Sequence, residues 1–208
     1  MLYPLPAVLV TSKGADGTED VLTVAWAGTI CTNPPMVSIS VRPERFSYEL
    51  IRSSGEFVIN LTTEDLAWAV DFCGVRSGRD IDKFQEAHLT KEPADKVSAP
   101  LIAESPVNIE CVVKEEKKLG SHSMFIAEVV AVHADEKYMD ENGRFSFEKA
   151  HPIVYSHGSY NALGKKLGTF GYSVKKFTNK NSTKKNNTKK NNAKMNHHGR
   201  NSTKNLLN

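Results

Sequence analysis

Four side chains of this sequence are suited to binding an anion. Arg42 and Arg45 precede a predicted helix that begins at Ser47, and Lys83 follows later in the chain. Positively charged and hydroxyl side chains at a helix start, where backbone N–H groups are free, are usual donors to a phosphate. Each charge taken alone is also consistent with a solvated surface side chain. An anionic ligand is therefore one hypothesis, and ordinary surface charge is the other.

The segment WAGTICTNPP, residues 26–35, could form a surface for a flat ring. It joins two predicted strands, and its small and hydroxylated residues would expose backbone N–H and C=O groups to the polar edge of a ring. Pro34 and Pro35 restrict φ and cannot donate a ladder hydrogen bond, so they would define the approach to the next strand. A plain loop explains the same residues, and both interpretations remain open.

Histidine and tyrosine add further candidates. His122 lies just before a predicted strand, where its ring could donate to a carbonyl or a phosphate, while the patterns around His151 and His157 are less specific. Tyr155 and Tyr160 could stack on a planar ligand. Lone histidines are also common at polar surfaces, and aromatic residues near a terminal strand are common in cores.

Several well-known catalytic motifs are absent from the sequence. It contains no G-x-x-x-x-G-K-[ST], G-x-G-x-x-G, H-E-x-x-H or G-x-S-x-G pattern, which argues against a P-loop enzyme, a Rossmann dehydrogenase, a zinc protease and an α/β-hydrolase. Cys31, Cys73 and Cys111 form no C-x-x-C pair. The cysteines therefore predict neither a metal site nor a redox dithiol, and their sparse use is typical of a reducing cytosol.

Charge divides the 208-residue chain into two parts. Ten of its 27 Lys and Arg residues, and none of its Asp or Glu residues, lie in residues 174–208, so residues 1–173 carry a net charge of −7. The segment 174–208 also has ten asparagines and few apolar residues, which predicts a disordered basic tail. The tail is either an electrostatic arm or a neutral extension. Because no aromatic residues alternate with its charges, nucleic-acid binding is not expected.

The elements that must position these side chains are mostly short strands. Residues 36–41 place Val37, Ile39 and Val41 on one face and serines on the other, as strands with one buried face do, and residues 57–61 likewise place Phe57, Ile59 and Leu61 on one face. Further strands are predicted at Ala7–Thr11, Val21–Trp26, Ile109–Val113, Met124–His133 and Ile153–Ser156. Helices are predicted at Ser47–Ser53, from Thr62 or Thr63 to about Cys73 with Leu66, Ala69 and Val70 on its apolar face, and near Asp80–Ala87. This frequency of short strands predicts a small antiparallel barrel or sandwich decorated by helices.

Seven segments together resemble the flavin reductase-like family, and within it the flavoredoxin-type branch. They run from residue 3 to residue 173 and include TVAWAGTICTNPPMVSISVRPERFSYELI, WAVDFCGVRSGRDIDKF, LGSHSMFIAEVVAV and ALGKKLGTFGYS. The resemblance implies an FMN-binding split barrel, a six-stranded antiparallel Greek-key barrel with helical additions. It also implies a homodimer with the flavin near the interface, and a domain that occupies residues 1–173.

The resemblance also implies roles for individual residues. Trp26 and the run Thr29, Ile30, Cys31 and Thr32 match positions beside the flavin ring, and Tyr155 matches an aromatic residue there. Ser47 matches a phosphate-binding hydroxyl, Lys83 a basic contact and His122 a polar residue of the site. Arg42 is retained as an anion-binding candidate from its position before the helix. Asp20 falls where some relatives carry asparagine, so that contact is left open.

These observations predict an FMN-dependent oxidoreductase or electron carrier in the cytoplasm. Electrons would come from NADH, NADPH or a redox protein partner, and the flavin would be either released or retained. No protein acid or base is obligatory for hydride transfer, so His122 is only the first residue to test for a catalytic role. No apolar run approaches the ~20 residues of a membrane span, and no signal peptide is expected. The alternative function is a non-enzymatic binding module that acts through its basic tail on an acidic partner.

Overall fold

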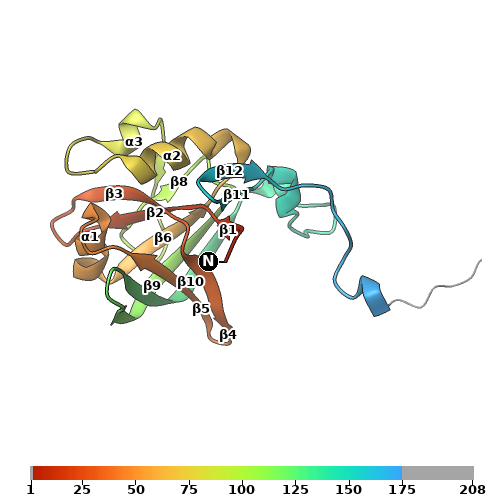
Figure 1. Cartoon of the computed structure of the whole chain (residues 1–208), viewed down its shortest axis with the longest axis horizontal. Coiled ribbons are helices and arrows are strands. Elements are labelled where there is room, and N and C mark those ends of the chain that lie inside the picture. The colour runs from red at the N-terminus through yellow and green to blue at the C-terminus, as the bar shows by residue number, and fades with distance from the viewer. Residues whose placement is uncertain (1, 175–208) are drawn as a thin grey trace, which may run out of the picture. The chain divides into compact units, whose positions relative to one another are not determined.

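Seven strands pair into one antiparallel sheet in the order β3-β2-β6-β9-β10-β5-β4 (Figure 1). The protein is described here by a computed structural model, which covers residues 2–174. The seven strands are β2 (Val8–Lys13), β3 (Glu19–Val24), β4 (Ala27–Thr32), β5 (Pro35–Val41), β6 (Glu56–Leu61), β9 (Val107–Lys118) and β10 (Ser123–Ala134). Their pattern agrees with the alternation seen in the sequence, since Val37, Ile39 and Val41 are all buried.

The two edges of this sheet belong to one continuous piece of chain. β3 pairs with β2 and β4 pairs with β5, and only Ala25 and Trp26 separate β3 from β4. The N–H of Ser40 in β5 donates to the carbonyl of Trp26 at 2.8 Å. This hydrogen bond holds the bend between β3 and β4 against β5. If β3 and β4 are counted as one continuous length of chain, six such lengths form an incompletely closed barrel. The predicted split barrel with helical additions is confirmed.

The sequence prediction for residues 27–35 was wrong in one respect. This segment is not a plain connection, because Ala27–Thr32 forms β4 with the register Ala27↔Ile39, Gly28↔Ser38 and Thr29↔Val37. Its side chains are largely exposed, so the segment lacks the apolar alternation by which buried strands are recognised. β4 and β5 form a hairpin, labelled at the bottom of Figure 1.

Three helices cover parts of the sheet, namely α1 (Phe46–Ser54), α2 (Ala67–Val75) and α3 (Lys83–Glu86). A 3₁₀ turn at Glu64–Leu66 precedes α2, whose predicted apolar face is confirmed by the burial of Ala69, Val70 and Cys73. α1 packs against β2 and β3, and α2 packs mainly against β3. The helix predicted to begin at Ser47, where the serine could serve as a cap, instead begins at Phe46 with Arg45 at its N-cap position.

Two apolar clusters lie on opposite faces of the sheet. Val10, Leu22 and Ile39 belong to the cluster inside the barrel, whereas Leu9 and Val21 face the helices and pack with residues such as Val70. Neighbouring residues of β2 and β3 thus serve different cores, as the two-residue period of a strand dictates. Burial of both faces fixes the position of α2 against β3, and this arrangement forms one side of the cavity described below.

Smaller elements complete the described chain. β1 (Leu5–Pro6), β11 (Ile153–Ser156) and β12 (Ser159–Ala162) form a three-stranded sheet, and β7 (Lys91–Glu92) pairs with β8 (Leu101–Ile102). 3₁₀ turns occupy Glu136–Tyr138, Phe147–Ala150 and Tyr172–Val174. The contacts divide the chain into units of residues 1–164 and 165–208. The domain boundary predicted at residue 173 stays a prediction, and the predicted tail, apart from Val174, lies outside the described residues.

Within residues 2–174, no helix is both long enough and apolar enough to cross a membrane.

Candidate functional site

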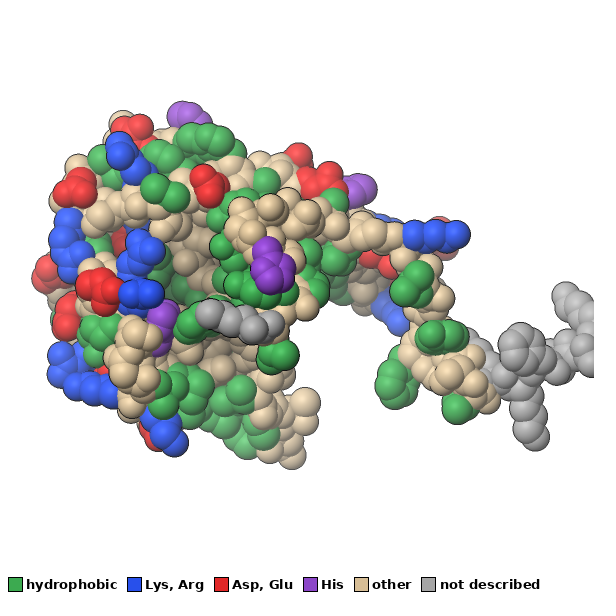
Figure 2. Space-filling model, in the orientation of Figure 1, with side chains coloured by type: hydrophobic (Ala, Val, Ile, Leu, Met, Phe, Trp, Pro, Cys, Tyr) green, Lys and Arg blue, Asp and Glu red, His purple; other side chains and the backbone are tan. Residues whose placement is uncertain are grey.

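A cavity of about 540 Å³ lies where β3 bends into β4. Its walls come from the ends of β3 and β5, from α2, from the β11–β12 hairpin and from the turn before β10. The space-filling view shows a hollow in this face of the molecule, with Lys and Arg side chains at one rim and hydrophobic side chains at another (Figure 2). A volume of this size is within the range of sites for small ligands.

An aromatic pair forms one wall of this cavity. Trp26, at the bend between β3 and β4, stacks on His122 with ring centroids 4.3 Å apart and an angle of 33° between the rings. Burial lowers the pKa of His122 below 6.5, the charge of Arg42 lowers it further, and Glu44 opposes both. The imidazole is therefore neutral at pH 7, so it can either donate or accept a hydrogen bond. Trp26 is 42% exposed, which leaves ring surface available to a ligand.

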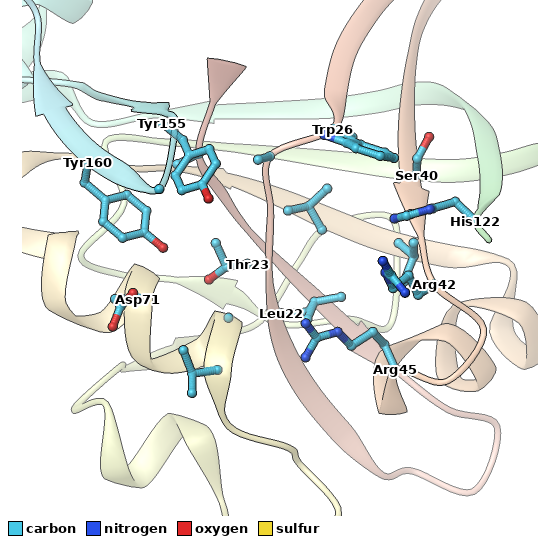
Figure 3. A pocket seen from close by; sticks show the side chains of 17 residues that line it. Leu22, Thr23, Trp26, Ser40, Arg42, Arg45, Asp71, His122, Tyr155 and Tyr160 are labelled. Carbon is cyan, nitrogen blue, oxygen red and sulfur yellow. The ribbon is translucent and has the colours of Figure 1, made fainter. Parts of the chain in front are cut away.

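Two tyrosines and an acid form the opposite end of the cavity (Figure 3). Tyr155 and Tyr160, on the paired strands β11 and β12, have ring centroids 5.5 Å apart. Burial raises the pKa of Tyr160 to about 12, and the nearby carboxylate of Asp71 on α2 contributes to the same shift. The phenol is therefore protonated across the physiological pH range and remains a hydrogen-bond donor.

Arginines form the other end of the cavity, at the junction of β5 and α1. Arg42 pairs with Glu44 at 3.2 Å, while Arg45 occupies the N-cap position of α1. Both also line an adjoining hollow of about 400 Å³, which we call the arginine hollow. Its walls are formed by Asp20, Leu22, Arg42, Glu44, Arg45, Phe46, Arg76, Ser77, Gly78, Arg79 and Lys83. Five cationic and two acidic side chains meet there, so the hollow favours an anion.

The structure brings together some of the predicted site residues and separates others. Trp26, Arg42, His122 and Tyr155 line the main cavity. Thr29, Ile30, Cys31 and Thr32 do not, because β4 carries them away from it along the hairpin. Their contact with a ligand stays a prediction.

Ser47 and Lys83 are buried beneath the arginine hollow rather than at the surface of the main cavity. Ser47 Oγ donates to Asp20 Oδ2, and Lys83 Nζ lies 2.8 Å from Asp20 Oδ1. Ser47 is fully buried and Lys83 is 3% exposed. Both donors bind the carboxylate of Asp20 in this arrangement, and their direct contact with a phosphate stays a prediction.

Sequence reasoning missed Ser40, Asp71, Arg76 and Arg79. The segment VRSGR after α2 offered a signal, since it places two arginines around a Ser-Gly pair. Ser40 and Asp71 gave no such signal in the sequence, because only the fold places one turn of α2 opposite the end of β5.

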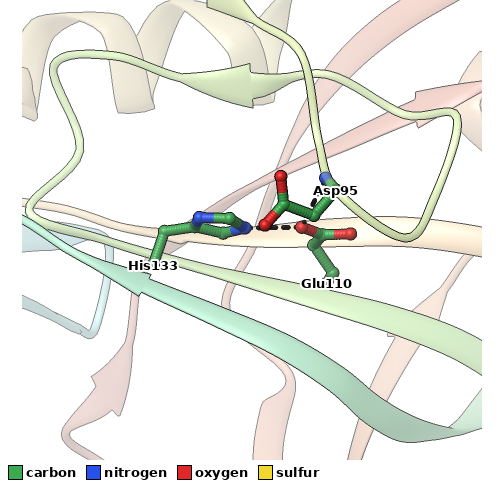
Figure 4. Close-up of side chains that lie close together, drawn as sticks. All are labelled: Asp95, Glu110 and His133. Atoms are coloured by element: carbon green, nitrogen blue, oxygen red, sulfur yellow. Dashed lines mark hydrogen bonds and ion pairs between the residues drawn. The ribbon is translucent and has the colours of Figure 1, made fainter.

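A separate cluster consists of Asp95, Glu110 and His133, whose possible ligand atoms all lie within 4.8 Å of one another (Figure 4). Glu110 on β9 is fully buried, and its oxygens accept backbone N–H groups of residues 95, 96 and 97 at 2.9, 2.6 and 3.0 Å. His133 Nε2 on β10 lies 2.5 Å from Glu110 Oε1. Both carboxylate oxygens of Glu110 are already hydrogen-bonded. We therefore interpret the cluster as a clamp that ties the loop around residues 95–97 to the sheet.

Comparison with known proteins gives the fold and cavity a family context. A family model described as the flavin reductase like domain matches residues 1–164. The chain belongs to the flavin reductase-like family. This finding confirms the resemblance seen in the sequence, and it also explains the absence of a G-x-G-x-x-G motif, which belongs to a different fold.

Two flavoredoxins are among the solved structures that are similar to this chain. The flavoredoxin of Desulfovibrio vulgaris (Miyazaki F) has a TM-score of 0.78 and 29% identity, and the match covers 84% of this chain and 95% of that one. The flavoredoxin from Methanosarcina acetivorans has a TM-score of 0.76 and 26% identity with the same coverages.

Three proteins illustrate the sequence relatives. An uncharacterized protein of Pyrococcus abyssi is 31% identical over 71% of this chain and 86% of its own length. Another, from Aeropyrum pernix, is also 31% identical over 74% of this chain, which spans only 58% of that longer relative. The reductase component of a 4-nitrophenol monooxygenase from Rhodococcus opacus is 26% identical over 61% of this chain and 65% of its own length. The family and these relatives support a flavin-binding redox role.

Proposed function

We propose that this protein binds FMN in the main cavity and uses it to pass electrons from NAD(P)H or a protein donor to an acceptor. The observation that carries the proposal is the chemical division of the cavity. Two arginines lie at one end, two tyrosines at the other, and Trp26 contributes to the wall on the side of the arginines. FMN is divided in the same way, with a phosphate at one end and a flat ring that has a polar edge at the other.

The residues present fit such a ligand. Arg42 and Arg45 would hold the phosphate, because guanidinium groups donate to phosphate oxygens in a planar fork. Trp26 and Tyr155 would contact the ring, and the protonated hydroxyl of Tyr160 would donate to its polar edge. The bound flavin supplies the redox chemistry, and the protein binds it, orients it and limits the access of water.

The donor and the acceptor define two versions of this function. Similarity to the reductase component from Rhodococcus opacus favours a flavin reductase that takes electrons from NADH or NADPH. Similarity to the two flavoredoxins favours a carrier that retains its flavin and exchanges electrons with a partner protein. Both versions use the same cavity, so the experiment must separate reduction by nucleotides from reduction by proteins.

The test is a visible absorption spectrum of the purified full-length protein, before and after addition of FMN, followed by NADH or NADPH without oxygen. A bound flavin that is bleached by a nucleotide would support the reductase. A bound flavin that is bleached by dithionite but by neither nucleotide would support the carrier. A protein that takes up no FMN would contradict the proposed function in both versions.

We further propose that the protein is a homodimer formed through the β4–β5 hairpin. This hairpin exposes Ile30, which is 49% accessible, and Trp26, just before the hairpin, is 42% accessible. Pairing of two such hairpins would cover these apolar side chains and would bring Thr29–Thr32 towards the flavin site of the other copy.

A further inference from the structure

The most buried charged side chains that line the arginine hollow, which we call its floor, are a carboxylate and a cation, Asp20 and Lys83. Asp20 lies on β3 and is only 2% exposed, yet it lines the hollow together with four arginines. A site that attracts an anion thus has an acidic group on its floor. The effect of Asp20 on a bound anion depends on which hydrogen-bond donors its carboxylate already binds.

Asp20 binds two buried donors, Lys83 of the hollow and Ser47 behind it. Lys83 Nζ lies 2.8 Å from one carboxylate oxygen, and Ser47 Oγ donates to the other. Both partners are buried, so the group of three is shielded from solvent. An ion pair in such a place is strongly coupled, because little water screens it.

The backbone of the loop after α2 holds Asp20 in this position. A Cβ atom added at Gly78 would overlap Asp20 Oδ1, so the loop passes directly against the carboxylate. A side chain at position 78 would displace the acid or the loop. The carboxylate therefore cannot swing away from Lys83 and Ser47 without moving its surroundings.

The cations that remain for a ligand are the guanidinium groups around the rim. Arg79 donates to the carbonyl of Glu44 at 3.1 Å and lies over the ring of Phe46. Arg45 and Arg76 have no ion pair among the described residues. The hollow thus has a neutralised floor and a positively charged rim.

We propose that Asp20 determines how strongly this protein distinguishes flavins with a phosphate from flavins without one. Its carboxylate neutralises Lys83 and accepts from Ser47, so that the phosphate of FMN is bound at the rim chiefly by Arg45 and Arg76, because Arg42 is already paired with Glu44. The preference for FMN over riboflavin is consequently smaller than the number of cations suggests. This inference rests on the proposed binding of FMN in the adjoining cavity.

The experiment measures the dissociation constants of FMN and riboflavin on the full-length protein by quenching of flavin fluorescence. Asp20→Asn removes the negative charge and leaves the charge of Lys83 on the floor. We expect FMN to bind about tenfold more tightly and riboflavin to bind as before, because only FMN carries the phosphate. A folded Asp20→Asn variant with an unchanged ratio of the two constants would overturn the proposal.

Four further variants keep the test decisive even where Asp20→Asn does not fold. The pair Asp20→Asn/Lys83→Met removes both charges together, so the ratio should return to the wild-type value. Arg45→Met or Arg76→Met should weaken FMN by about tenfold and leave riboflavin unchanged. Ser47→Ala should leave FMN affinity unchanged, because its hydroxyl is bound to Asp20, and a specific loss for FMN would overturn the proposal.

The failure of this inference is distinguishable from the failure of the proposed function. Wild-type protein that binds neither flavin would overturn both. Wild-type protein that binds FMN and riboflavin, combined with arginine variants that weaken both ligands equally, would overturn only the assignment of the arginine hollow. Circular dichroism of each variant at the assay temperature checks that a change in affinity is not a loss of folding.

Discussion

At the residue scale, the cavity depends on contacts between side chains that are far apart in the sequence. Trp26 and His122 stack, Asp71 faces Tyr160, and Asp20 binds both Ser47 and Lys83. The position of a histidine just before a strand indicated His122 as a candidate, and the family resemblance indicated Trp26. The pairing of Asp20 with Lys83 and Ser47 could not be predicted, because the sequence does not show which charged residues will be buried.

The exposed ring of Trp26 gives the first prediction. Trp26→Ala removes one wall of the cavity and should weaken FMN binding about three- to tenfold, as expected for the loss of one aromatic contact. It should also shift the visible spectrum of the bound flavin. Trp68→Ala is the matched control, because Trp68 is 60% exposed on α2 and does not line the cavity. Equal effects of the two substitutions on FMN would remove Trp26 from the site.

The second prediction concerns the protonation of Tyr160. Its pKa of about 12, against an ordinary value of 10.0, results from burial and from the charge of Asp71. In a titration of tyrosinate absorbance, wild type and Tyr160→Phe should coincide near pH 10 and diverge only towards pH 12. Asp71→Asn removes part of the shift, so in that background the difference should begin at lower pH. A difference of one full tyrosinate near pH 10 in the wild-type background would contradict the prediction.

At the scale of elements, strands with one buried face were predicted well and β4 was not. β5 alternates apolar and polar residues because one face packs in a core, whereas β6 is buried on both faces, with Phe57 and Ile59 in one cluster and Val58 in another. β4 pairs through its backbone and exposes its side chains, so its sequence carries no such alternation. The start of α1 was misplaced for a related reason. Serine is a common N-cap, but here the hydroxyl of Ser47 bonds to Asp20 of a neighbouring strand.

The clamp around Glu110 gives a prediction about the stability of an element. Burial acts to raise the pKa of Glu110, but the bonds from His133 and from three backbone N–H groups outweigh it and lower the pKa below 4.5. Glu110→Gln should therefore reduce the free energy of unfolding by about 2 kcal/mol at pH 7, because the amide cannot accept all of these bonds. Denaturant unfolding followed by circular dichroism measures the difference.

The pH dependence of this effect has a defined sign. An acid whose pKa is lower in the folded state stabilises the fold above its unfolded pKa and loses that contribution as the pH falls. The difference between wild type and Glu110→Gln should thus shrink as the pH falls below 4.5. Glu49→Gln is the control, since Glu49 forms an exposed pair with Arg52 and should change stability by less than about 1 kcal/mol. A difference that stays constant down to acid pH would contradict the clamp.

At the scale of the whole molecule, the arginine hollow shows where sequence reasoning ends. Its cations come from three segments, around residues 42–45, 76–79 and 83. The sequence indicated Arg42 and Arg45 because they precede a predicted helix, and Lys83 because it is a basic residue that matches a contact of the family. The convergence of all three segments depends on α1 and α3 both packing near β3, which no local pattern encodes.

The proposed dimer is the prediction that belongs to the whole molecule. Ile30→Asp places a charge on the exposed face of β4 and should convert a dimer into a monomer, which light scattering after size exclusion measures. Cys31 offers a second measurement. Burial raises the pKa of Cys73 and Cys111 to about 12, so a thiol reagent at neutral pH should reach Cys31 before either of them. We expect Cys31 to react more slowly in wild type than in Ile30→Asp, because the second copy covers β4.

Val132→Asp separates this interface from a general effect of added charge. Val132 is 59% exposed on β10, outside the β4–β5 hairpin, so its substitution should leave the dimer intact. Dissociation by Val132→Asp but not by Ile30→Asp would place the interface on β10 instead. A wild-type monomer that still binds FMN would mean that one copy of the cavity is sufficient, and that Thr29–Thr32 have no part in the site.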